Sequence, residues 1–466
     1  MKGLVSLVGA GPGNPDLITV LGKKRLNQAD IILYDRLVNS AILVGTKADK
    51  IYVGKSSFKK SISQTNINHL LADLALQGKR IVRLKSGDPY VFGRGGEEAF
   101  YLKRQGVNFE IIPGLTSAIA GLTAAGIPVT DRNFASSFHV ITGHHKKGHP
   151  GIDWENIAHQ EGTLIFLMGM GNLDLIVQKL LAYGKSSATP AAVIQWATFW
   201  KQKTVFSTLL NIEKKVKQSH LGPPALIVIG KVVNLKAKLA SFSPLQGLHI
   251  LAPFQKKSAL FDELQDKGAS LDFFARDKIK PISFKMPHLE KNPVIFVSDF
   301  LAFYIFLQRL LKEGFDYRHL SGCSLIAADN YQAKKLKRLG FIADKITKVI
   351  EFSQLSKPVV EFVSTEDNKK LKNKKIRKIG VYKKRYVPQE FDFKDFQAVI
   401  LPNVECTKDL FFGCNLKQQA VLKKLPCYVW QTEVFNFCKD LKFNTIIKVK
   451  KNKPDLISTL KRRLKK

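Results

Sequence analysis

Residues 83–98, RLKSGDPYVFGRGGEE, constrain the fold more than any other stretch of this sequence. They continue a run of strand-forming residues and then place several glycines around a Gly-Asp-Pro turn, together with two arginines and a pair of glutamates. Because glycine has no Cβ, main chain in such a loop can lie against a ligand without side-chain obstruction. The stretch therefore predicts a ligand site at the end of a strand.

The same arrangement recurs through the first half of the chain. The spacing of apolar residues at 17–29 predicts a helix, and short apolar runs that end in small or polar residues predict strands. These runs lie at 3–11, 30–35, 81–88, 108–114, 162–171, 190–198 and 223–233. In an open α/β sheet ligands bind outside the carboxyl ends of the strands. We therefore predict an α/β fold whose site is formed by these loops.

The organisation changes near residue 243. The segment 238–253, KLASFSPLQGLHILAP, is typical of a linker followed by a new first strand, and strand and helix patterns resume after it at 262–274, 293–314 and 324–341. A chain of 466 residues is long enough for more than one domain. We predict two domains, residues 1–242 and 243–466.

Composition limits the class of protein. The net charge of +36 favours an acidic partner or a lysine-rich solvated surface, and both interpretations stay open, as does the role of the basic tail at 448–466. No apolar run reaches the about 18 residues of a membrane span, and no signal peptide precedes the first glycine loop. The five cysteines lie in the second half without a C-x-x-C pair, which indicates reduced, mostly buried thiols. We expect a cytoplasmic protein with no membrane partner.

The first glycine loop, VGAGPGNPDLIT at 8–19, allows an alternative. A dinucleotide-binding fold uses such a loop, and Asp35 stands where an acidic residue would bind a ribose hydroxyl. Pro12 lies inside the loop, however, and the G-x-x-G spacing does not follow. A nicotinamide-dependent oxidoreductase is therefore a distant alternative.

Several motifs taken in order carry a more specific signal. The stretch 83–98, together with GPG at 11–13, YDRLV at 34–38, VGK at 53–55, PGLTSA at 113–118 and AGIPVTDR at 125–132, closely resembles the uroporphyrinogen-III C-methyltransferases. These enzymes belong to the tetrapyrrole methylase family and bind S-adenosylmethionine. The resemblance covers roughly residues 3–240, and FGRGGEE at 92–98 separates it from the branches of the family that modify ribosomal RNA or a translation factor.

The resemblance implies a fold and an activity. The expected fold is the two-lobed tetrapyrrole methylase fold, and the expected reaction is methylation of uroporphyrinogen III at two pyrrole carbons to give precorrin-2, for sirohaem or cobalamin. Members of the family are commonly homodimers, and no nucleic acid is expected to take part. The alternative from another class is a basic RNA-binding methyltransferase.

The resemblance also implies roles for individual residues. Asp35 corresponds to the proposed proton acceptor and Lys55 to the proposed proton donor. Ten positions correspond to residues that hold S-adenosylmethionine: Pro12, Ser86, Gly87, Asp88, Val91, Thr116, Ser117, Met168, Ala197 and Ala225. Two residues depart from the family pattern, since Ser86 replaces a usual glycine and Trp196 stands where arginine is common.

The chemistry accounts for these residue types. A pyrrole carbon attacks the methyl group of a sulfonium, so the enzyme chiefly positions two reactants, and a carboxylate such as Asp35 can take the proton that the methylated ring releases. The substrate is rich in carboxylates. Arg36, Arg94 and Arg132 each lie beside a site loop and are predicted to bind it through forked contacts.

Simpler interpretations stand beside these. Asp35 can cap a helix, and Glu97 and Glu98, at the start of a predicted helix, are expected to complement the helix dipole rather than to act as a catalytic pair. His144, His145 and His149 invite a metal site, but no cysteine or carboxylate joins them in their loop, so we predict no metal.

The order of elements in residues 243–466 resembles uroporphyrinogen-III synthase, whose fold has two lobes. The resemblance implies one lobe at about 245–280 plus 390–466 and another at about 285–385. The arginine usual after the first strand is absent from LAPFQKK at 251–257, Gln332 stands where threonine is usual, and a serine loop has become ILPNVE at 400–405. Synthase activity and a purely structural role therefore both remain open. Ser298 and Tyr331 are the residues to test first.

Overall fold

The computed structural model describes ten segments of the chain. They are residues 3–54, 62–143, 151–239, 243–255, 258–276, 278–347, 357–365, 376–389, 391–450 and 453–464. By contacts the chain divides into two compact units, of which one comprises Met1–Phe274, Asp392–Asn403 and Val421–Lys466 and the other Ala275–Phe391 and Val404–Ala420.

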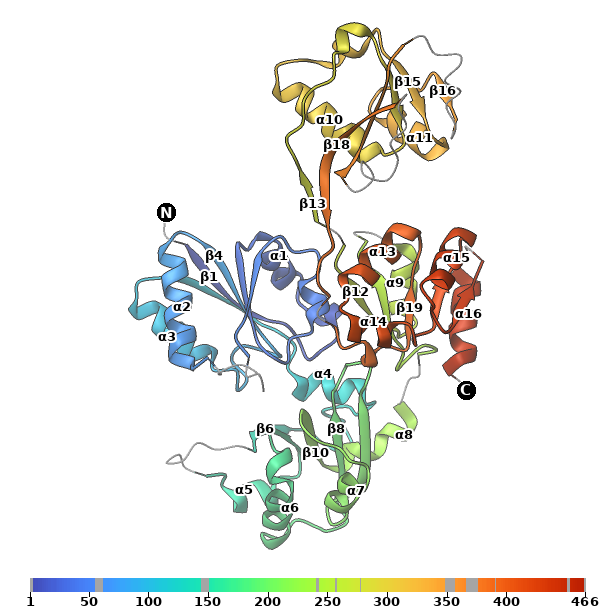
Figure 1. The fold of residues 1–466 in the computed structure, drawn as a ribbon. Helices are drawn as coiled ribbons and strands as arrows, with labels where there is room; N and C mark the ends of the chain where they lie inside the picture. The colour runs from blue at the N-terminus through green and yellow to red at the C-terminus, as the bar shows by residue number, and fades with distance from the viewer. Residues whose placement is uncertain are drawn as a thin grey trace. The chain divides into compact units, whose positions relative to one another are not determined.

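The first sheet of the larger unit is parallel and has the strand order β3-β2-β4-β1-β5 (Figure 1). Its strands are β1 (Leu4–Gly9), β2 (Ile31–Tyr34), β3 (Asp49–Tyr52), β4 (Arg80–Lys85) and β5 (Asn108–Ile112). The central strands β1 and β4 are almost entirely buried because helices cover both faces of the sheet, although β4 carries Arg83 and Lys85 among its apolar residues. In this register Leu7 of β1 and Leu33 of β2 both lie opposite Arg83 of β4.

Helices on the two faces build two cores. Helices α2 (Gln64–Leu76) and α3 (Gly95–Arg104) pack on the face that carries Val5 and Leu7, and α1 (Val20–Gln28) packs on the face that carries Val8. The side chains of Thr19 and Ser63 accept hydrogen bonds from backbone N–H groups in the first turns of α1 and α2. The short 3₁₀ segments η1 (Pro15–Leu17) and η2 (Ser40–Leu43) follow β1 and β2.

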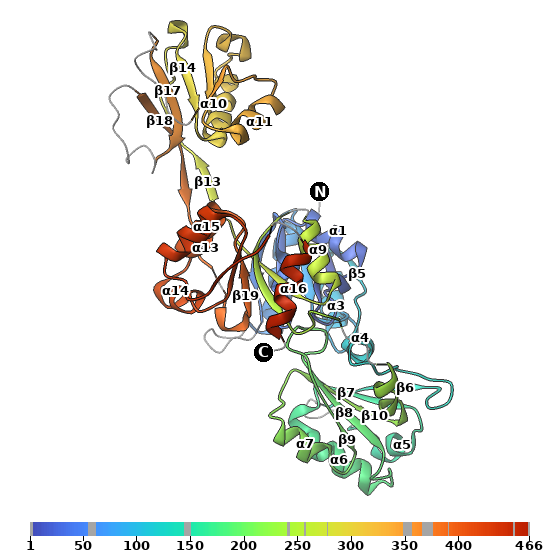
Figure 2. The ribbon, with the colours of Figure 1, turned by 90° about the vertical axis from the view of Figure 1, so that its right-hand side faces the viewer.

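The second sheet has the order β6-β7-β10-β8-β9, and only the β6–β7 pair is parallel. Its strands are β6 (Phe138–Thr142), β7 (Thr163–Leu167), β8 (Pro190–Gln195), β9 (Lys203–Thr208) and β10 (Ala225–Ile229). Figure 2 shows α5 (Trp154–His159), α6 (Leu173–Ala182) and α7 (Ile212–Gln218) on one side of it. Helix α4 (Ser117–Ala124) and η4 (Lys231–Leu235) pack on the other face, η3 (Met170–Asn172) follows β7, and α8 (Lys236–Leu239) follows η4.

A third sheet in this unit has the order β12-β11-β19-β20-β21. Its strands are β11 (His249–Pro253), β12 (Ser270–Phe274), β19 (Ala398–Ile400), β20 (Cys427–Val429) and β21 (Ile446–Lys448). Its core includes Phe261 and Leu264 of α9 (Ala259–Asp266) and Leu456 of α16 (Lys453–Leu464). Helix α15 (Thr432–Asp440) connects β20 to β21, and η8 (Phe393–Asp395) precedes β19.

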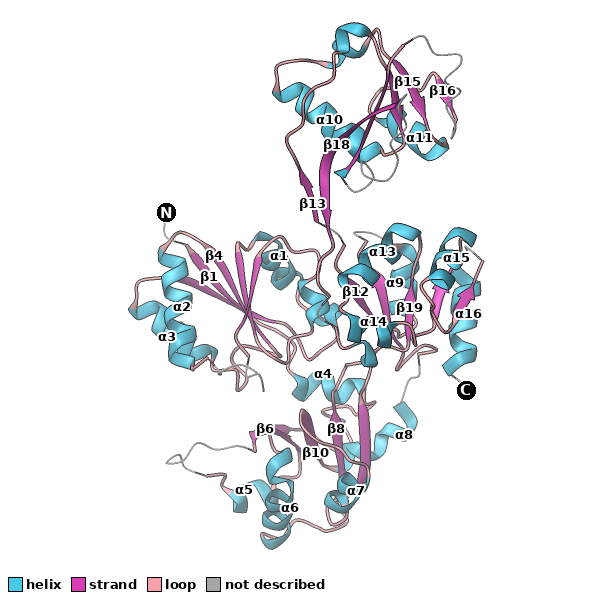
Figure 3. Ribbon diagram, in the orientation of Figure 1, coloured by secondary structure: helices cyan, strands magenta, loops and turns pink. Residues whose placement is uncertain are grey.

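The smaller unit contains a six-stranded sheet with the order β13-β18-β17-β14-β15-β16. Its strands are β13 (Lys278–Pro281), β14 (Val294–Val297), β15 (Ser324–Ala327), β16 (Lys345–Ile346), β17 (Val359–Ser364) and β18 (Ile376–Arg385). Helices α10 (Phe300–Lys312) and α11 (Asn330–Arg338) lie beside these strands in Figure 3 and supply much of the core. Other helical segments are η5 (Leu289–Lys291), η6 (Tyr317–Leu320), α13 (Val404–Gly413) and α14 (Leu416–Leu422).

The predicted strands and the helix at 17–29 are present, and the fold is α/β as expected. The expectation for residues 278–281 is wrong, because β13 joins the sheet of the second lobe through an antiparallel pairing with β18. The helix-cap alternative for Asp35 is also wrong: Asn39 caps the following helical segment, and the Asp35 carboxylate accepts a hydrogen bond from Arg83. All five cysteines are free and four are buried, as expected. The boundary between residues 242 and 243 stays a prediction.

No helix in the described segments combines the length and apolar character needed to cross a membrane.

Candidate active site

A cavity of about 430 Å³ lies in the larger unit, lined by loops of the first two sheets. The loops after β1, β2 and β4 and the start of α4 supply one wall, and the ends of β7 and β8 and the start of β10 supply the other. The structure brings all ten residues predicted to hold the cofactor to this cavity: Pro12, Ser86, Gly87, Asp88, Val91, Thr116, Ser117, Met168, Ala197 and Ala225. Their roles remain predictions, but their convergence comes from segments more than two hundred residues apart.

Three glycine-containing loops meet at one wall through main chain alone. A Cβ on Gly9 would lie 2.5 Å from the backbone of Gly114 and 2.6 Å from the carbonyl oxygen of Gly87. Gly87 has φ of 70° and donates a 2.8 Å hydrogen bond from its N–H to the carbonyl oxygen of Gly11. This close approach requires glycine, because any side chain would separate the loops.

Asp88 fixes this arrangement. One carboxylate oxygen accepts a hydrogen bond from the Tyr90 N–H at 2.7 Å and the other accepts one from the Gly114 N–H at 3.0 Å. Both carboxylate oxygens of Asp88 therefore bind backbone amides and connect the second and third loops. The Gly-Asp-Pro segment is also a packing surface: Gly93 and Gly95 pack on Pro89, where a Cβ would meet its carbonyl oxygen at 2.6 and 2.5 Å.

The opposite wall contains backbone in sparsely populated conformations. Met168 and Trp196 have φ of 57° and 50°, in the left-handed region that residues with side chains seldom adopt. Such conformations cluster at ligand sites, where the surrounding structure maintains them. Trp196, at the position where arginine is common in the family, lines the cavity and lies under the ammonium of Lys201, which is 4.1 Å from the ring centroid.

The sequence interpretation gave no cofactor-binding role to several other residues that line the cavity. Leu37, Phe92, Gly93, Leu167, Met170, Gly171, Ile194, Trp196, Phe199, Pro223, Pro224 and Leu226 also line the cavity. Most are apolar, as is usual for a pocket that binds an organic ligand. Their neighbours in sequence carry the motifs, so proximity along the chain was the available signal.

A second cavity, of about 900 Å³, shares Arg36, Leu37, Ser86, Phe92 and Gly93 with the first. Four further charged residues line it: Asp35, Arg83, Lys85 and Arg94. The two cavities are therefore neighbours, and Asp35, the predicted proton acceptor, belongs to the second. Cationic side chains outnumber carboxylates in its lining.

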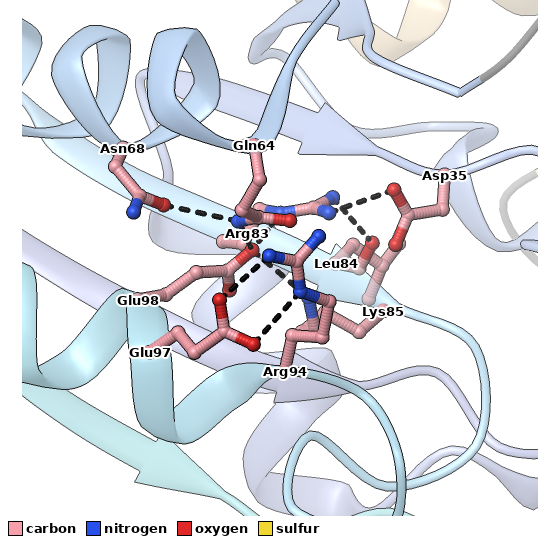
Figure 4. A network of polar contacts seen from close by, with 9 residues as sticks. All are labelled: Asp35, Gln64, Asn68, Arg83, Leu84, Lys85, Arg94, Glu97 and Glu98. Carbon is pink, nitrogen blue, oxygen red and sulfur yellow. Dashed lines mark hydrogen bonds and ion pairs between the residues drawn. The ribbon is translucent and has the colours of Figure 1, made fainter. Parts of the chain in front are cut away.

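A network of polar contacts that includes buried charged side chains adjoins this second cavity, and Figure 4 shows the network. The Arg83 guanidinium donates to a carboxylate oxygen of Asp35 at 2.7 Å and, through Nε, to Oε1 of Glu98 at 3.2 Å. Lys85 and Gln64 also donate to Oε1 of Glu98, each at 2.9 Å. Burial, together with the adjacent Arg83 guanidinium, lowers the pKa of Lys85 below its ordinary value. Glu98 lies in the first turn of α3, where an acid complements the helix dipole as expected, and it is also a fully buried member of an ion cluster.

The three arginines predicted to bind the substrate differ in their surroundings. Arg36 is exposed and lines both cavities. Arg94 binds Glu97 in a forked ion pair with distances of 2.9 and 2.6 Å, which raises the pKa of Arg94. Arg132 is exposed and lines neither of these two cavities.

Some predictions lie outside the described residues. Lys55, the predicted proton donor, is one, and so are His144, His145 and His149. Among the residues that the structure describes, no group of three or more histidine, cysteine or acidic side chains could hold a metal ion.

Loops from the carboxyl edge of a parallel sheet and from a second sheet together line one cavity. This arrangement is typical of a two-lobed α/β protein that binds a ligand. The sequence profile of the family Tetrapyrrole (Corrin/Porphyrin) Methylases matches residues 4–213. The chain is 42% identical over 355 residues to the uroporphyrinogen-III C-methyltransferase of Bacillus subtilis. The aligned region covers 74% of this chain and 73% of that relative. The chain therefore belongs to the uroporphyrinogen-III C-methyltransferases of the tetrapyrrole methylase family.

Two further proteins are similar to this chain. The porphyrin biosynthesis protein HemD of Ruminiclostridium josui is 36% identical over 378 residues, or 78% of this chain and 75% of that protein. The crystal structure of uroporphyrin-III C-methyltransferase from Thermus thermophilus, complexed with S-adenyl homocysteine, has 38% sequence identity and a TM-score of 0.44, and covers 50% of this chain and 99% of its own.

Proposed function

We propose that this protein transfers methyl groups from S-adenosylmethionine to two pyrrole carbons of uroporphyrinogen III, giving precorrin-2 for sirohaem or cobalamin synthesis. Membership of the uroporphyrinogen-III C-methyltransferases supports the reaction class. The observation that carries the proposal is the convergence of the ten family-matched positions on one cavity, beside a second cavity that contains Asp35.

The first cavity fits a methyl donor of this size and polarity. Its volume of about 430 Å³ lies within the usual range for small-molecule sites. Main chain at Gly87 lines it directly, and side chains such as Leu226 and Phe92 give it apolar walls. When bound, the donor supplies an electrophilic methyl group on a sulfonium.

The chain's own residues bind, orient and exchange protons. The Thr116 side chain caps α4 by accepting a hydrogen bond from the Ala118 N–H at 3.3 Å. Thr116 and Ser117 therefore place the start of this helix beside the donor. In the second cavity, Arg36 and Arg94 are suited to the carboxylates of the macrocycle. Asp35 takes the proton that the methylated ring releases, and the electron pair of the broken bond returns to the macrocycle.

The test is methyl transfer from labelled S-adenosylmethionine to two acceptors in parallel, reduced uroporphyrin III and total RNA. Label in the tetrapyrrole, with two methyl groups per molecule at completion, is the expected result. Label only in RNA would instead identify a basic RNA-binding methyltransferase, and label in neither would reject both activities. Donor binding is measured separately by calorimetry with S-adenosylhomocysteine.

A second candidate function, uroporphyrinogen-III synthase activity in residues 243–466, is favoured by a specific observation. The similarity to HemD covers 78% of this chain, more than residues 1–242 can supply. The strands at 249–274 and 398–448 form one sheet, and those at 278–385 form another. The test supplies hydroxymethylbilane and scores the ring isomer. The inverted isomer is expected, and formation of only the uninverted isomer would reject this activity.

The proposal extends to assembly and location. We infer a homodimer in the cytoplasm, with a small tetrapyrrole as the partner of the site rather than nucleic acid. Sedimentation equilibrium of the full chain tests the dimer. A concentration-independent mass of 52.3 kDa would contradict it.

A further inference from the structure

A cluster of buried charged side chains lies at the central strand of the first sheet. The side chains of Arg83, Lys85 and Glu98 are 2%, 4% and 0% exposed. Taking such groups out of water costs several kcal/mol for each ion, and well-packed apolar residues would fill the same space at lower cost. A cluster of this kind indicates a role other than stability.

The cluster is continuous with the site through one strand. Arg83 and Lys85 lie two residues apart on β4, so their side chains share one face of the sheet, and Ser86, Gly87 and Asp88 follow directly. Strand β4 therefore carries the buried Arg83 guanidinium, which binds Asp35, and leads directly into the glycine loop that lines the donor cavity. Any shift of β4 moves both.

Only one member of the cluster reaches Asp35. Arg83 donates to the Asp35 carboxylate at 2.7 Å and to Glu98 at 3.2 Å. Lys85 and Gln64 donate to Glu98, and Gln64 also donates to the side-chain oxygen of Asn68 at 3.0 Å. The Asp35 side chain is 31% exposed and lines the second cavity. Asp35 therefore faces solvent space on one side and a fixed guanidinium on the other.

Glu98 anchors the guanidinium from behind. Its Oε1 accepts from all three donors, whereas its Oε2 has no hydrogen-bond partner among the described residues. As carboxylates, Glu98 and Asp35 together balance the charges of Arg83 and Lys85.

We propose that Arg83 is a positioning residue for the methyl-transfer reaction: anchored on Glu98, it orients the Asp35 carboxylate toward the substrate cavity. This inference rests on the proposed function. It assigns Arg83 no contact with the substrate, and it predicts that the effect of Arg83 on turnover operates through Asp35.

The experiment is a double-mutant cycle on the full chain with Asp35→Asn, Arg83→Met and the combined variant. Arg83→Met is expected to lower kcat by about 10²-fold, the usual effect of misplacing a reacting group by an ångström. The KM for S-adenosylmethionine and the Kd for S-adenosylhomocysteine should stay within about 2-fold of wild type. In the Asp35→Asn background the same substitution should lower kcat by about 2-fold or less. Equal effects in both backgrounds would overturn the proposal.

Two variants separate positioning from folding. Glu98→Gln keeps the shape of the side chain that anchors Arg83 but removes its charge, and it takes the place of Arg83→Met if that variant does not fold. It should lower kcat clearly in the wild-type background and little in the Asp35→Asn background. Arg25→Met is the matched control, because Arg25 makes a forked ion pair with Glu110 in the same lobe and lines neither of the two site cavities. It should lower the melting temperature and act additively with Asp35→Asn.

Crystal structures keep the inference testable if the protein methylates neither uroporphyrinogen III nor RNA. Wild type should place the Asp35 carboxylate on Arg83, and Arg83→Met should turn it away from that position while β2 and β4 stay paired. An unmoved Asp35 in the variant would overturn the inference even if methyl transfer is confirmed. Failure of the proposed function appears instead as absent label transfer by wild type.

Discussion

The strand ends of the first sheet and those of the sheet in the smaller unit are built differently. In the first sheet the loops after β1, β4 and β5 meet through glycine main chain beside a cavity. In the smaller unit, polar side chains that follow β14 bind polar side chains within β17 and β18. Ser298 donates to Glu361 at 2.5 Å, and Tyr382 donates to Asp299 at 2.6 Å.

This difference teaches how a site can be distinguished from a polar core. Backbone brought close without side chains leaves space for a ligand beside it, whereas polar side chains that bind one another occupy the space between the strands. Gln332, where threonine is usual in the synthase family, also turns inward, because its side-chain oxygen accepts from the Phe300 N–H at 3.1 Å. Tyr331, by contrast, is 62% exposed.

The strongest test of the comparison replaces a glycine at the meeting point of the loops. Gly9→Val is expected to abolish binding of S-adenosylhomocysteine and to lower the free energy of unfolding by about 3 kcal/mol, because its Cβ would lie 2.5 Å from Gly114. Calorimetry and urea unfolding measure the two effects. Gly96→Ala is the control, since no atom lies within 4 Å of its Cβ and it is helical. Equal losses in both variants would contradict the argument.

Asp35→Asn tests the chemical role of the same edge. It should lower the methyl-transfer rate by about 10²-fold to 10⁴-fold, because an amide cannot accept the released proton. Binding of S-adenosylhomocysteine should be unchanged, since Asp35 does not line the donor cavity. Asp49→Asn, on an exposed carboxylate of β3, should leave both measurements at wild-type values. A normal rate for Asp35→Asn would remove Asp35 from the mechanism.

Ser298→Ala probes the network of polar side chains in the smaller unit. Glu361 is 5% exposed and would keep only Lys378, at 3.4 Å, of the two partners described here. Loss of one hydrogen bond to a buried carboxylate should lower the free energy of unfolding by about 2 kcal/mol. Methyl transfer serves as the internal reference and should not change. A fully stable variant would show that the network is looser than the geometry indicates.

The smallest effect concerns a buried thiol in the same unit. Burial raises the pKa of Cys414 from 9.0 to about 12. Between these values the unfolded chain loses the thiol proton and the folded chain keeps it, so stability should fall as pH rises, by at most about 1.4 kcal/mol per pH unit. Cys414→Ala should remove this slope. Urea unfolding at several pH values above 9 measures it, and parallel curves for the two proteins would refute the assignment.

Particular elements show how far sequence reasoning reached. The apolar runs predicted β1, β4 and β10 because buried strands are rich in hydrophobic residues, and the ten positions taken from the family motifs all lie among the residues that line the first cavity. The missed strand β3, with the sequence DKIY, carries an exposed and charged edge that has no such signature. β13 was assigned to the wrong lobe, because its pairing with β18 depends on residues about a hundred positions away.

The buried ion cluster shows the same limit. The strand IVRLK places two cations in an apolar run, and a buried charge demands a partner. That signal was present, but nothing in the local sequence identifies the partner as Glu98 rather than Glu97. Glu97 instead binds Arg94 at the surface.

By itself the sequence determined the α/β class, the glycine loops and the family, because apolar periodicity and side-chain-free turns are local properties that each segment carries alone. Only the tertiary structure decided that Asp35 contacts Arg83, that Glu98 is buried behind it, and that loops from two sheets enclose one cavity. Those features depend on strand register and on how helices cover a sheet, since a shift of one residue would exchange the faces on which Arg83 and Leu84 lie.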